Sequence, residues 1–382
     1  MKKKNSILKG RKLNILPTLL ICNILIFYTC CNIGRHNNNS ISLVKANDTV
    51  LNYSRYSTKI YGAEPNPTGE PIGGGLGYSK IITSYTYLVR TKEELLSTLK
   101  KAKSRDIIYI TDTSRINLSG CPVIKIPEGV TLASGRGKDN SEGALLFSNE
   151  LKTFPMFETG GEYVHVTGLR FSGPDTTRRT EQMKELYKEG KYYSIPNSRG
   201  IQSSYSHSEI DNCEFWGWSD AAIYLILNKK LIKCDSNYIH NNYFHHCQRE
   251  GLGYGVCLDN AQALIEANIF DCCRHGIAGT GRTNTSYEAR FNLVLEHFNS
   301  HAFDMHGGAD RKDSTNIAGN TIRIHHNTFK LINQSDVVIR GIPVIGAEIY
   351  NNYFYNKDST KSVLQINAHG NFKMYNNKFG VK

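Results

Sequence analysis

Proline is scarce in this chain, and residues that favour helices become sparse after about residue 105. Only 10 prolines occur among 382 residues, whereas glycine reaches 33 and tyrosine 22. A chain with this balance is typical of short strands joined by many turns. The composition therefore predicts an all-β fold, and the length leaves room for one large domain or two ordinary ones.

Acidic residues are absent from residues 1–29, which combine a basic start with the apolar run LNILPTLLICNILIFYT. This is the plan of a secretory signal, and the run is short for a membrane-spanning helix. FYTC resembles a bacterial lipobox, so we expect Cys30 to be lipidated and to anchor the protein to a membrane; an uncleaved signal anchor is the alternative. We expect a lipoprotein peptide over 1–30, a polar tether and N-terminal extension over 31–80, and an exported protein of the cell envelope, facing the outer membrane or the periplasm.

Nucleic-acid-binding motifs are also missing, although the formal net charge is +12. A basic exported protein suits an acidic partner, such as a polyuronate or a sulfated glycan. We therefore expect an acidic polysaccharide as the partner, no nucleic acid, and a monomer.

A six-residue motif, apolar-x-x-Asn-x-Phe, recurs along the chain. The clear copies are IHNNYF (239–244), IEANIF (265–270), IHHNTF (324–329), IYNNYF (349–354) and MYNNKF (374–379), and degenerate copies end at 171, 215 and 294. Most neighbouring copies lie about 25 residues apart, and short alternating strands at this period are typical of a β-solenoid. The leucine spacing of a leucine-rich repeat, which has a similar length, is absent.

The repeat also predicts how the coils are held together. Stacked asparagines would form a ladder of side-chain amides, and stacked Phe, Ile and Val would fill the interior. The segment 91–103 places leucines on one helical face, and Thr91 with Glu94 matches a capping box. A short helix there would cover the open end of the first coil.

With these features the chain resembles the right-handed parallel β-helix proteins of the pectate lyase superfamily. The resemblance lies in TKEELLSTLKKAKSRDIIYITDTSRINL, in VIKIPEGVTLASGRG and in the repeats from 164 to 379. It implies one right-handed parallel β-helix over 81–382, with a short N-terminal capping helix and an inserted loop at 173–200. The superfamily contains lyases, hydrolases, epimerases and non-catalytic proteins, so the resemblance leaves the activity open.

A second strand follows each motif, and aligning these strands predicts one outer face of the solenoid. The aligned strands are AAIYLI (221–226), GLGYGV (251–256), GIAGTG (276–281), AFDMHG (302–307) and VVIRG (337–341). Strand alternation then makes Gly253, Gly255 and Ala278 a bare floor on which a chain-like ligand could lie. Charged residues stand beside that floor, namely Asp304, His306, Arg340, Glu250, Arg274, His275 and His301.

This face suits the cleavage of a uronic-acid-containing glycan by β-elimination. Arg274 and Arg340 would neutralise the substrate carboxylate. His275 or His306, oriented by Asp304, would remove the neighbouring proton. Tyr254 or Tyr287 would protonate the leaving oxygen. The expected substrate contacts are Gly253, Gly255, Glu250, His301, Tyr224 and Trp218, the last through stacking on a sugar ring.

Two other functions stay open at this point. A glycoside hydrolase on the same fold needs a pair of carboxylic acids, for which Asp304 would join Glu250, Asp259 or Asp220. A non-catalytic glycan-binding lipoprotein needs neither acid nor base.

No cofactor is firmly predicted, and a divalent metal, calcium or zinc, is the alternative. Family lyases often place calcium beside an Arg or Lys base, but this chain lacks an obvious acidic calcium cluster. His301, Asp304 and His306 offer a set of nitrogen and oxygen donors that zinc accepts.

Three smaller predictions concern neighbouring coils. Arg290 should pair with Glu266 one coil away. Cys247 and Cys273 should stack as thiols, with a disulfide as the alternative. The insertion 173–200 is basic and tyrosine-rich, and it would either wall the groove or form a plain surface excursion.

Overall fold

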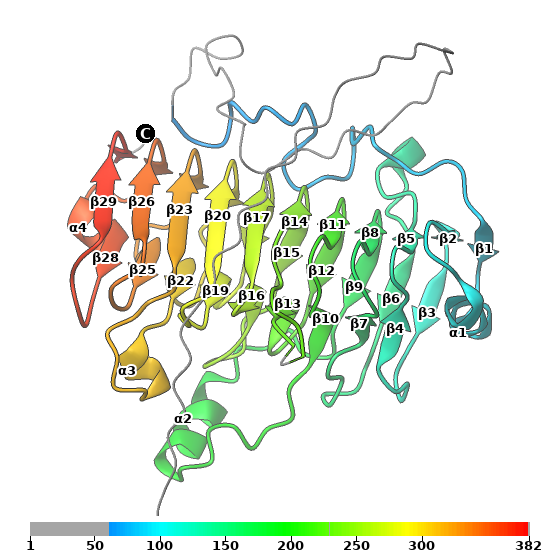
Figure 1. Cartoon of the computed structure of the whole chain (residues 1–382), viewed down its shortest axis with the longest axis horizontal. Coiled ribbons are helices and arrows are strands. Elements are labelled where there is room, and N and C mark those ends of the chain that lie inside the picture. The colour runs from blue at the N-terminus through cyan, green and yellow to red at the C-terminus, as the bar shows by residue number, and fades with distance from the viewer. Residues whose placement is uncertain (1–60, 229, 381–382) are drawn as a thin grey trace, which may run out of the picture. The chain divides into compact units, whose positions relative to one another are not determined.

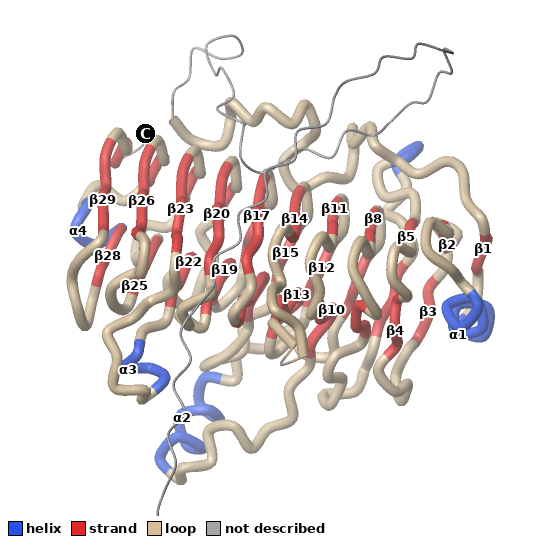
Figure 2. The backbone as a smooth tube through the Cα atoms, viewed as in Figure 1, coloured by secondary structure: helices blue, strands red, loops and turns tan. Residues whose placement is uncertain are grey.

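The computed structural model describes residues 61–228 and 230–380, and there the chain winds as a parallel β-helix. Each complete coil contributes one strand to each of three parallel sheets, which we call sheets A, B and C in the order in which the chain enters them (Figure 1). The strands are short and turns join them, with few helices (Figure 2). The predicted all-β solenoid is confirmed. The predicted signal and Cys30 lie outside the described residues.

The strands of each sheet lie side by side in the following order. Sheet A consists of β1 (Tyr87–Val89), β2 (Ile107–Ile110), β5 (Thr131–Ala133), β8 (His165–Thr167), β11 (Glu209–Asp211), β14 (Asn237–His240), β17 (Gln262–Glu266), β20 (Ser286–Arg290), β23 (Thr321–His325), β26 (Gly346–Tyr350) and β29 (Phe372–Tyr375). Sheet B consists of β3 (Arg115–Asn117), β6 (Leu145–Phe147), β9 (Arg170–Ser172), β12 (Glu214–Trp216), β15 (Tyr243–His245), β18 (Ile269–Asp271), β21 (Leu293–Val294), β24 (Thr328–Phe329), β27 (Tyr353–Phe354) and β30 (Lys378–Phe379). Sheet C consists of β4 (Ile124–Ile126), β7 (Phe157–Thr159), β10 (Arg199–Ser203), β13 (Ala221–Ile226), β16 (Tyr254–Asp259), β19 (His275–Gly279), β22 (Phe303–Met305), β25 (Val337–Ile339) and β28 (Val363–Gln365).

The predicted capping helix is α1, which runs over Lys92–Lys101. Thr91 and Glu94 form the expected capping box, and Leu95 and Leu99 are buried in the common core. The other helical segments of the described residues are α2 (Thr180–Lys188), α3 (Gly308–Arg311), α4 (Ser359–Ser362) and a short 3-10 turn over Lys138–Asn140. Within 61–228 and 230–380, no helix has both the length and the apolar character needed to cross a membrane.

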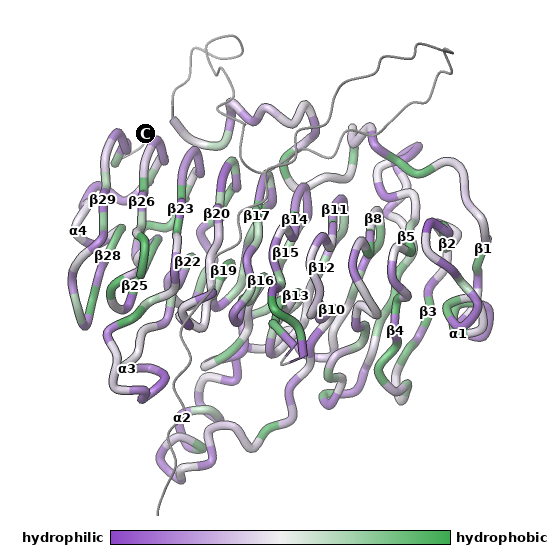
Figure 3. Tube along the Cα trace, in the orientation of Figure 1, coloured by the Kyte–Doolittle hydropathy of each residue, from purple (hydrophilic) through white to green (hydrophobic). Residues whose placement is uncertain are grey.

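The interior of the solenoid is built from the phenylalanines that end each motif. Phe215, Phe244 and Phe270 occupy the same register in sheet B, and their ring centroids are 5.3 and 5.0 Å apart. In the next coil the smaller Val294 occupies this position. The ring of Phe303, from sheet C, packs edge-on against Phe270 instead. Apolar and polar stretches accordingly alternate along each coil (Figure 3). The predicted column of apolar side chains is confirmed.

A ladder of stacked asparagines runs along the solenoid at the tight turns between sheets A and B. The amide oxygen of Asn292 accepts hydrogen bonds from the backbone and side-chain N–H groups of Asn268, both at 3.0 Å. Its Nδ2 donates to the backbone carbonyl of Ile265 at 2.9 Å and to Oδ1 of Asn327 at 2.9 Å. The same pattern continues along the ladder, which consists of Asn242, Asn268, Asn292, Asn327, Asn352 and Asn377. Each amide inside the ladder therefore ties its coil to both neighbours, and Asn377 at its end is tied to the preceding coil.

The first described residues, 61–80, are hydrogen-bonded to these same turns. The Gly73 N–H donates to the carbonyl of Ala267 at 2.8 Å, and Asn241 Nδ2 donates to the carbonyl of Pro71 at 2.9 Å. This part of the predicted N-terminal extension thus packs against the solenoid.

The ladder gives a direct stability prediction. Asn292→Ala removes the acceptor of the Asn268 N–H and the Nδ2 donor to the Ile265 carbonyl, and each such loss in the interior costs about 1–3 kcal/mol. We expect the free energy of unfolding, measured by urea denaturation, to fall by at least about 2 kcal/mol. Asn149→Ala, at an exposed position, is the control and should change it by less than about 0.5 kcal/mol. Equal losses in the two variants would show that the ladder does not hold the coils together.

Candidate functional site

The outer face of sheet C gathers the charged and aromatic residues of the expected site. One outward column follows from the strand register and contains Gln202, Tyr224, Cys257, Ala278, Asp304 and Val338. A second outward column contains Arg199, Ala221, Tyr254 and His275. His306 and Arg340 follow directly after β22 and β25. The register thus confirms that Tyr224, Ala278 and Asp304 share one face.

The predicted glycine floor is wrong. Cys257, not Gly253, pairs with Tyr224 and Ala278. Gly253 lies in the turn before β16 with a φ of 82°, and its carbonyl accepts the Arg274 N–H. Gly255 faces the interior, because a Cβ there would lie 3.0 Å from the ring of Phe270. The alignment assumed turns of one length, but the turn at 246–253 is longer than the turn at 272–274.

Asp304 is the centre of the cluster, and its side chain is completely buried. Arg340 holds it with two hydrogen bonds, from Nε to Oδ1 at 2.9 Å and from Nη2 to Oδ2 at 3.1 Å. His301 Nε2 lies 3.1 Å from Oδ1, and His306 Nε2 lies 2.8 Å from Oδ2. Asp310 binds the remaining Nη1 of Arg340 at 3.0 Å. One carboxylate therefore organises an arginine and two histidines.

His275 approaches the same carboxylate from the neighbouring coil and is also completely buried. Its Nδ1 lies 2.6 Å from the carbonyl oxygen of His301, which can only accept, so Nδ1 carries the proton. Its Nε2 lies 3.7 Å from Asp304 Oδ2 and has no hydrogen-bond partner among the described residues. Burial, together with the charge of Arg274, lowers the pKa of His275 well below its usual value, so the ring is neutral.

The charge of Asp304 is fixed by its neighbours. Burial raises the pKa of this carboxyl, but the charge of His306 and the hydrogen bonds from His301 and His306 outweigh burial and hold the pKa well below its usual value. Burial lowers the pKa of Arg340, and the charge of Asp304 outweighs it, so the pKa of the guanidinium is raised. The pair is ionised throughout the physiological range.

Arg274 differs from Arg340 because it is not committed to a carboxylate. Its Nε and Nη1 are buried and have no hydrogen-bond partner within the described part of the chain. Its guanidinium carbon lies 6.0 Å from the ring centroid of Tyr254, and that ring stacks on His275 with centroids 5.6 Å apart. The Tyr254 hydroxyl donates to the Gly251 carbonyl at 3.4 Å, and burial raises its pKa, so it keeps its proton.

The insertion 173–200 packs against the long turn beside the site. Arg178 donates from Nε to Gln248 at 3.0 Å, and its carbonyl accepts the N–H of Glu250 at 2.8 Å. Arg249 is buried under the insertion. Tyr192 touches Gly251, and the charge of Arg274 acts on its hydroxyl. The insertion thus walls this end of the face, and it brings Tyr192, which the repeat pattern did not single out.

Two further predicted contacts have different surroundings. Tyr224 lies on the outer face with the Arg199 guanidinium 3.6 Å from its ring centroid, and Arg199 pairs with Asp220 at 2.7 Å. Trp218 does not face a ligand, because its ring lies fully buried in the core and its Nε1 donates to the carbonyl of Phe171 at 3.3 Å. The prediction that Trp218 stacks on a sugar is therefore wrong.

Three groups among the described residues place enough metal-binding atoms close together to hold an ion. They are His275 with His301 and Asp304, His165 with Glu209 and Asp211, and Asp271 with Cys272 and His297. The predicted set of His301, Asp304 and His306 is corrected in one member, because the histidine that completes a mutually close set is His275.

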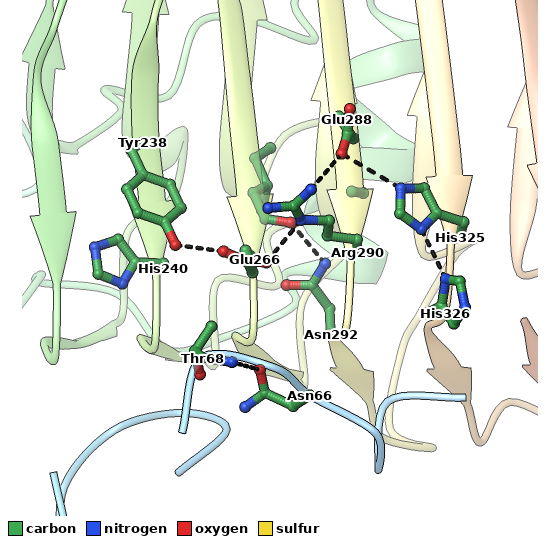
Figure 4. A network of polar contacts seen from close by, with 12 residues as sticks. Asn66, Thr68, Tyr238, His240, Glu266, Glu288, Arg290, Asn292, His325 and His326 are labelled. Carbon is green, nitrogen blue, oxygen red and sulfur yellow. Dashed lines mark hydrogen bonds and ion pairs between the residues drawn. The ribbon is translucent and has the colours of Figure 1, made fainter. Parts of the chain in front are cut away.

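A second polar network lies on the outer face of sheet A (Figure 4). Arg290 donates to Glu266 at 2.6 Å and to Glu288 at 3.0 Å, and His325 Nε2 lies 3.3 Å from Glu288. The Tyr238 hydroxyl donates to Glu266. The predicted pair of Arg290 and Glu266 is confirmed. Acids and bases alternate along neighbouring strands here and satisfy one another, which marks a structural network.

The network makes stability depend on pH. Burial raises the pKa of Glu288, but the hydrogen bond from His325 and the charge of Arg290 outweigh it and lower the pKa to about 2. A lowered folded-state pKa stabilises above the unfolded value of about 4.3, and this contribution is lost as the pH falls toward 2. Glu288→Gln should reduce the free energy of unfolding by about 1–3 kcal/mol at pH 7 and by almost nothing at pH 2.

Chemical denaturation at a series of pH values measures this effect. Glu93→Gln, at an exposed position of α1, is the control and should leave the profile unchanged. A Glu288→Gln deficit that is the same at pH 7 and pH 2 would contradict the ionic origin.

Comparisons with known proteins agree with the architecture. A family model described as a right handed beta helix region matches residues 106–294. The β-helix is right-handed. No curated protein is similar enough in sequence to count as a relative.

Solved structures with a similar course include enzymes and a viral protein. An alginate lyase from Paenibacillus sp. str. FPU-7 is 14% identical over 77% of this chain and 95% of that chain, with a TM-score of 0.46. A family 28 exopolygalacturonase from Yersinia enterocolitica is 11% identical over 75% and 62%, with a TM-score of 0.41. A tailspike protein of E. coli bacteriophage HK620, in complex with a pentasaccharide, is 12% identical over 80% and 66%, with a TM-score of 0.32. At this level of similarity, the activities of these proteins cannot be assigned to this right-handed β-helix.

Proposed function

We propose that this protein is an exported polysaccharide lyase that cleaves an acidic, uronic-acid-containing glycan by β-elimination on the outer face of sheet C. The observation that carries the proposal is the cluster around Asp304. There, a buried carboxylate fixes His301 and His306, and Arg274, which precedes His275 in the chain, is not engaged by any carboxylate among the described residues.

The two arginines take different roles. Arg340 is saturated by Asp304 and Asp310, so it positions the cluster. No carboxylate among the described residues engages Arg274, which is half-buried with its Nε and Nη1 in the interior, so its positive charge is available to a substrate carboxylate. We assign Arg274 to the uronate carboxylate, where its charge would make the adjacent C–H more acidic.

His306 is the better candidate for the base. The side chain of His275 is 0% exposed and cannot reach a substrate on the surface, whereas that of His306 is 27% exposed. His306 Nε2 lies 2.8 Å from Asp304, and a carboxylate partner directs the proton to that nitrogen and leaves Nδ1 free to accept another. The His–carboxylate pair also stabilises the imidazolium that forms.

The reaction balances without any further reagent. His306 takes the proton from the carbon beside the carboxylate, and the electron pair of that C–H bond forms a double bond to the neighbouring carbon. The C–O bond to the next sugar breaks, and its oxygen takes a proton from water. Tyr254 is not given this role, because its hydroxyl is held by Gly251.

Hydrolysis suits the geometry less well. A hydrolase needs one carboxylic acid that stays protonated opposite a second carboxylate. Asp304 has a lowered pKa and Asp259 accepts from Arg282 at 3.0 Å; burial raises the pKa of Asp220, but Arg199 binds its carboxylate at 2.7 Å. These carboxylates are committed to cations, which favours elimination.

Export and anchoring complete the proposal. The basic and apolar start of the chain and the Cys30 of FYTC support a lipoprotein of the cell envelope. An envelope location would place sheet C within reach of an extracellular or periplasmic acidic polysaccharide.

The near-ultraviolet absorbance of unsaturated products tests the activity. Incubation with a panel of uronate-containing polysaccharides should raise this absorbance for at least one glycan. His306→Ala should lower the rate by about 10²–10⁴-fold, the usual contribution of a general base, and Arg274→Ala should also lower it strongly. His297→Ala, whose side chain is 56% exposed beside Asp271, is the matched control and should keep the full rate.

Other outcomes would overturn the proposal. New reducing ends without absorbance would identify a hydrolase. Retardation in a glycan affinity gel without any cleavage would identify a binding protein. Unchanged turnover in His306→Ala would remove the assigned base.

A further inference from the structure

We propose that His275, His301 and Asp304 form a binding site for a divalent transition-metal ion such as Zn²⁺. The three residues come from adjacent coils, β19 and β22 with the turn before β22, and their ligand atoms lie close together. The site does not depend on lyase activity, because its readout is the bound metal.

The spacing of the donor atoms fits a small ion. Nitrogen and oxygen ligands that lie 2.0–2.1 Å from a tetrahedral zinc ion are about 3.3 Å from one another. His301 Nε2 lies 3.1 Å from Asp304 Oδ1, and His275 Nε2 lies 3.7 Å from Asp304 Oδ2. Both separations are close to that value. Three protein ligands would leave the fourth position open.

The tautomer of His275 is the one that a metal ligand has. A ligating histidine typically donates its other ring N–H to a carbonyl or a carboxylate. His275 Nδ1 donates to the His301 carbonyl, which leaves the lone pair of Nε2 directed toward Asp304. A lone pair facing a carboxylate in the interior is unfavourable, and this completely buried nitrogen has no hydrogen-bond partner within 61–228 and 230–380. A cation between the two groups would satisfy both.

Arg340 does not block the site. It uses one of the two lone pairs on each oxygen of Asp304, and His306 faces the second on Oδ2, so the second lone pair of Oδ1, which His301 faces, is the position for a metal. Arg340 Nη2 also lies 3.2 Å from His301 Nε2, and His301 would exchange this contact for the metal. Arg340 then fixes the orientation of the ligating carboxylate, as outer partners of metal ligands commonly do.

The donor set selects the class of metal. Two imidazole nitrogens and one carboxylate oxygen suit Zn²⁺ and other first-row transition metals. Calcium prefers six to eight oxygen ligands, and this cluster does not offer them.

Metal binding to the purified full-length protein tests the proposal. Isothermal titration with Zn²⁺ and the visible spectrum of Co²⁺ should both report a site that contains His275. The Asp271, Cys272 and His297 group could bind the same ions, so all proteins carry His297→Ala, which removes one of its donors. Calcium, added as a control, should not compete for the site.

Two ligand variants and one neighbour identify the site. His275→Ala and His301→Ala should each weaken zinc binding by more than the about 10–100-fold that loss of an outer partner costs. His306→Ala removes an outer partner of Asp304 that lies outside the donor set, so it should weaken zinc binding by no more than about 10–100-fold, less than either ligand variant, while turnover falls by about 10²–10⁴-fold. Circular dichroism and thermal unfolding of the apo-proteins verify that each variant is folded.

Each outcome decides the question. Absence of zinc binding to the parent protein, or equal affinity in His275→Ala and the parent, would overturn the site. Loss of binding in His306→Ala, with retention in His275→Ala, would assign the metal to His301, Asp304 and His306 instead. Zinc binding without lyase activity would leave the site standing and reject only the proposed function.

Discussion

Parallel pairing of successive coils in one register is the constraint on which this structure depends. No coil buries its own apolar side chains, so Phe244 is shielded only because Phe215 and Phe270 lie above and below it. The asparagine ladder enforces that register, since Asn268 and Asn292 bond only when their turns are aligned. Residues far apart in the chain, such as Asp304 and Arg340, become neighbours through the same alignment.

Much of this fold could be predicted because its determinants are local and repeated. Four of the five clear copies of the motif carry an isoleucine that faces inward, and all five carry an asparagine at the turn and a phenylalanine, so the period reveals sheets A and B. Alternation along the strand also predicts that Tyr287 faces inward while Glu288 and Arg290 face outward. The pairing of Arg290 with Glu266 was predictable because Glu266 occupies the matching position one coil earlier.

The candidate site was predictable in part. Phe303 lies 9 residues after the motif end at Val294, and Val337 lies 8 after Phe329, so the alignment of their strands held. The matching position in the earlier coil, Val256, lies 12 residues after Phe244, and nothing in the local pattern shows that the strand resumes so late. The pattern also cannot tell that His275 directs Nε2 at a carboxylate one coil away, because that depends on a ring orientation set by the carbonyl of His301.

The ladder occupies only the turn between sheets A and B, whereas the insertion 173–200 and the long turn 246–253 both lie between sheets B and C. Loops can therefore lengthen or change along one flank of the molecule while the opposite edge keeps the coils aligned. Divergence in ligand preference would then require only loop exchange beside the outer face of sheet C, and related chains could evolve new specificities without rebuilding their interior.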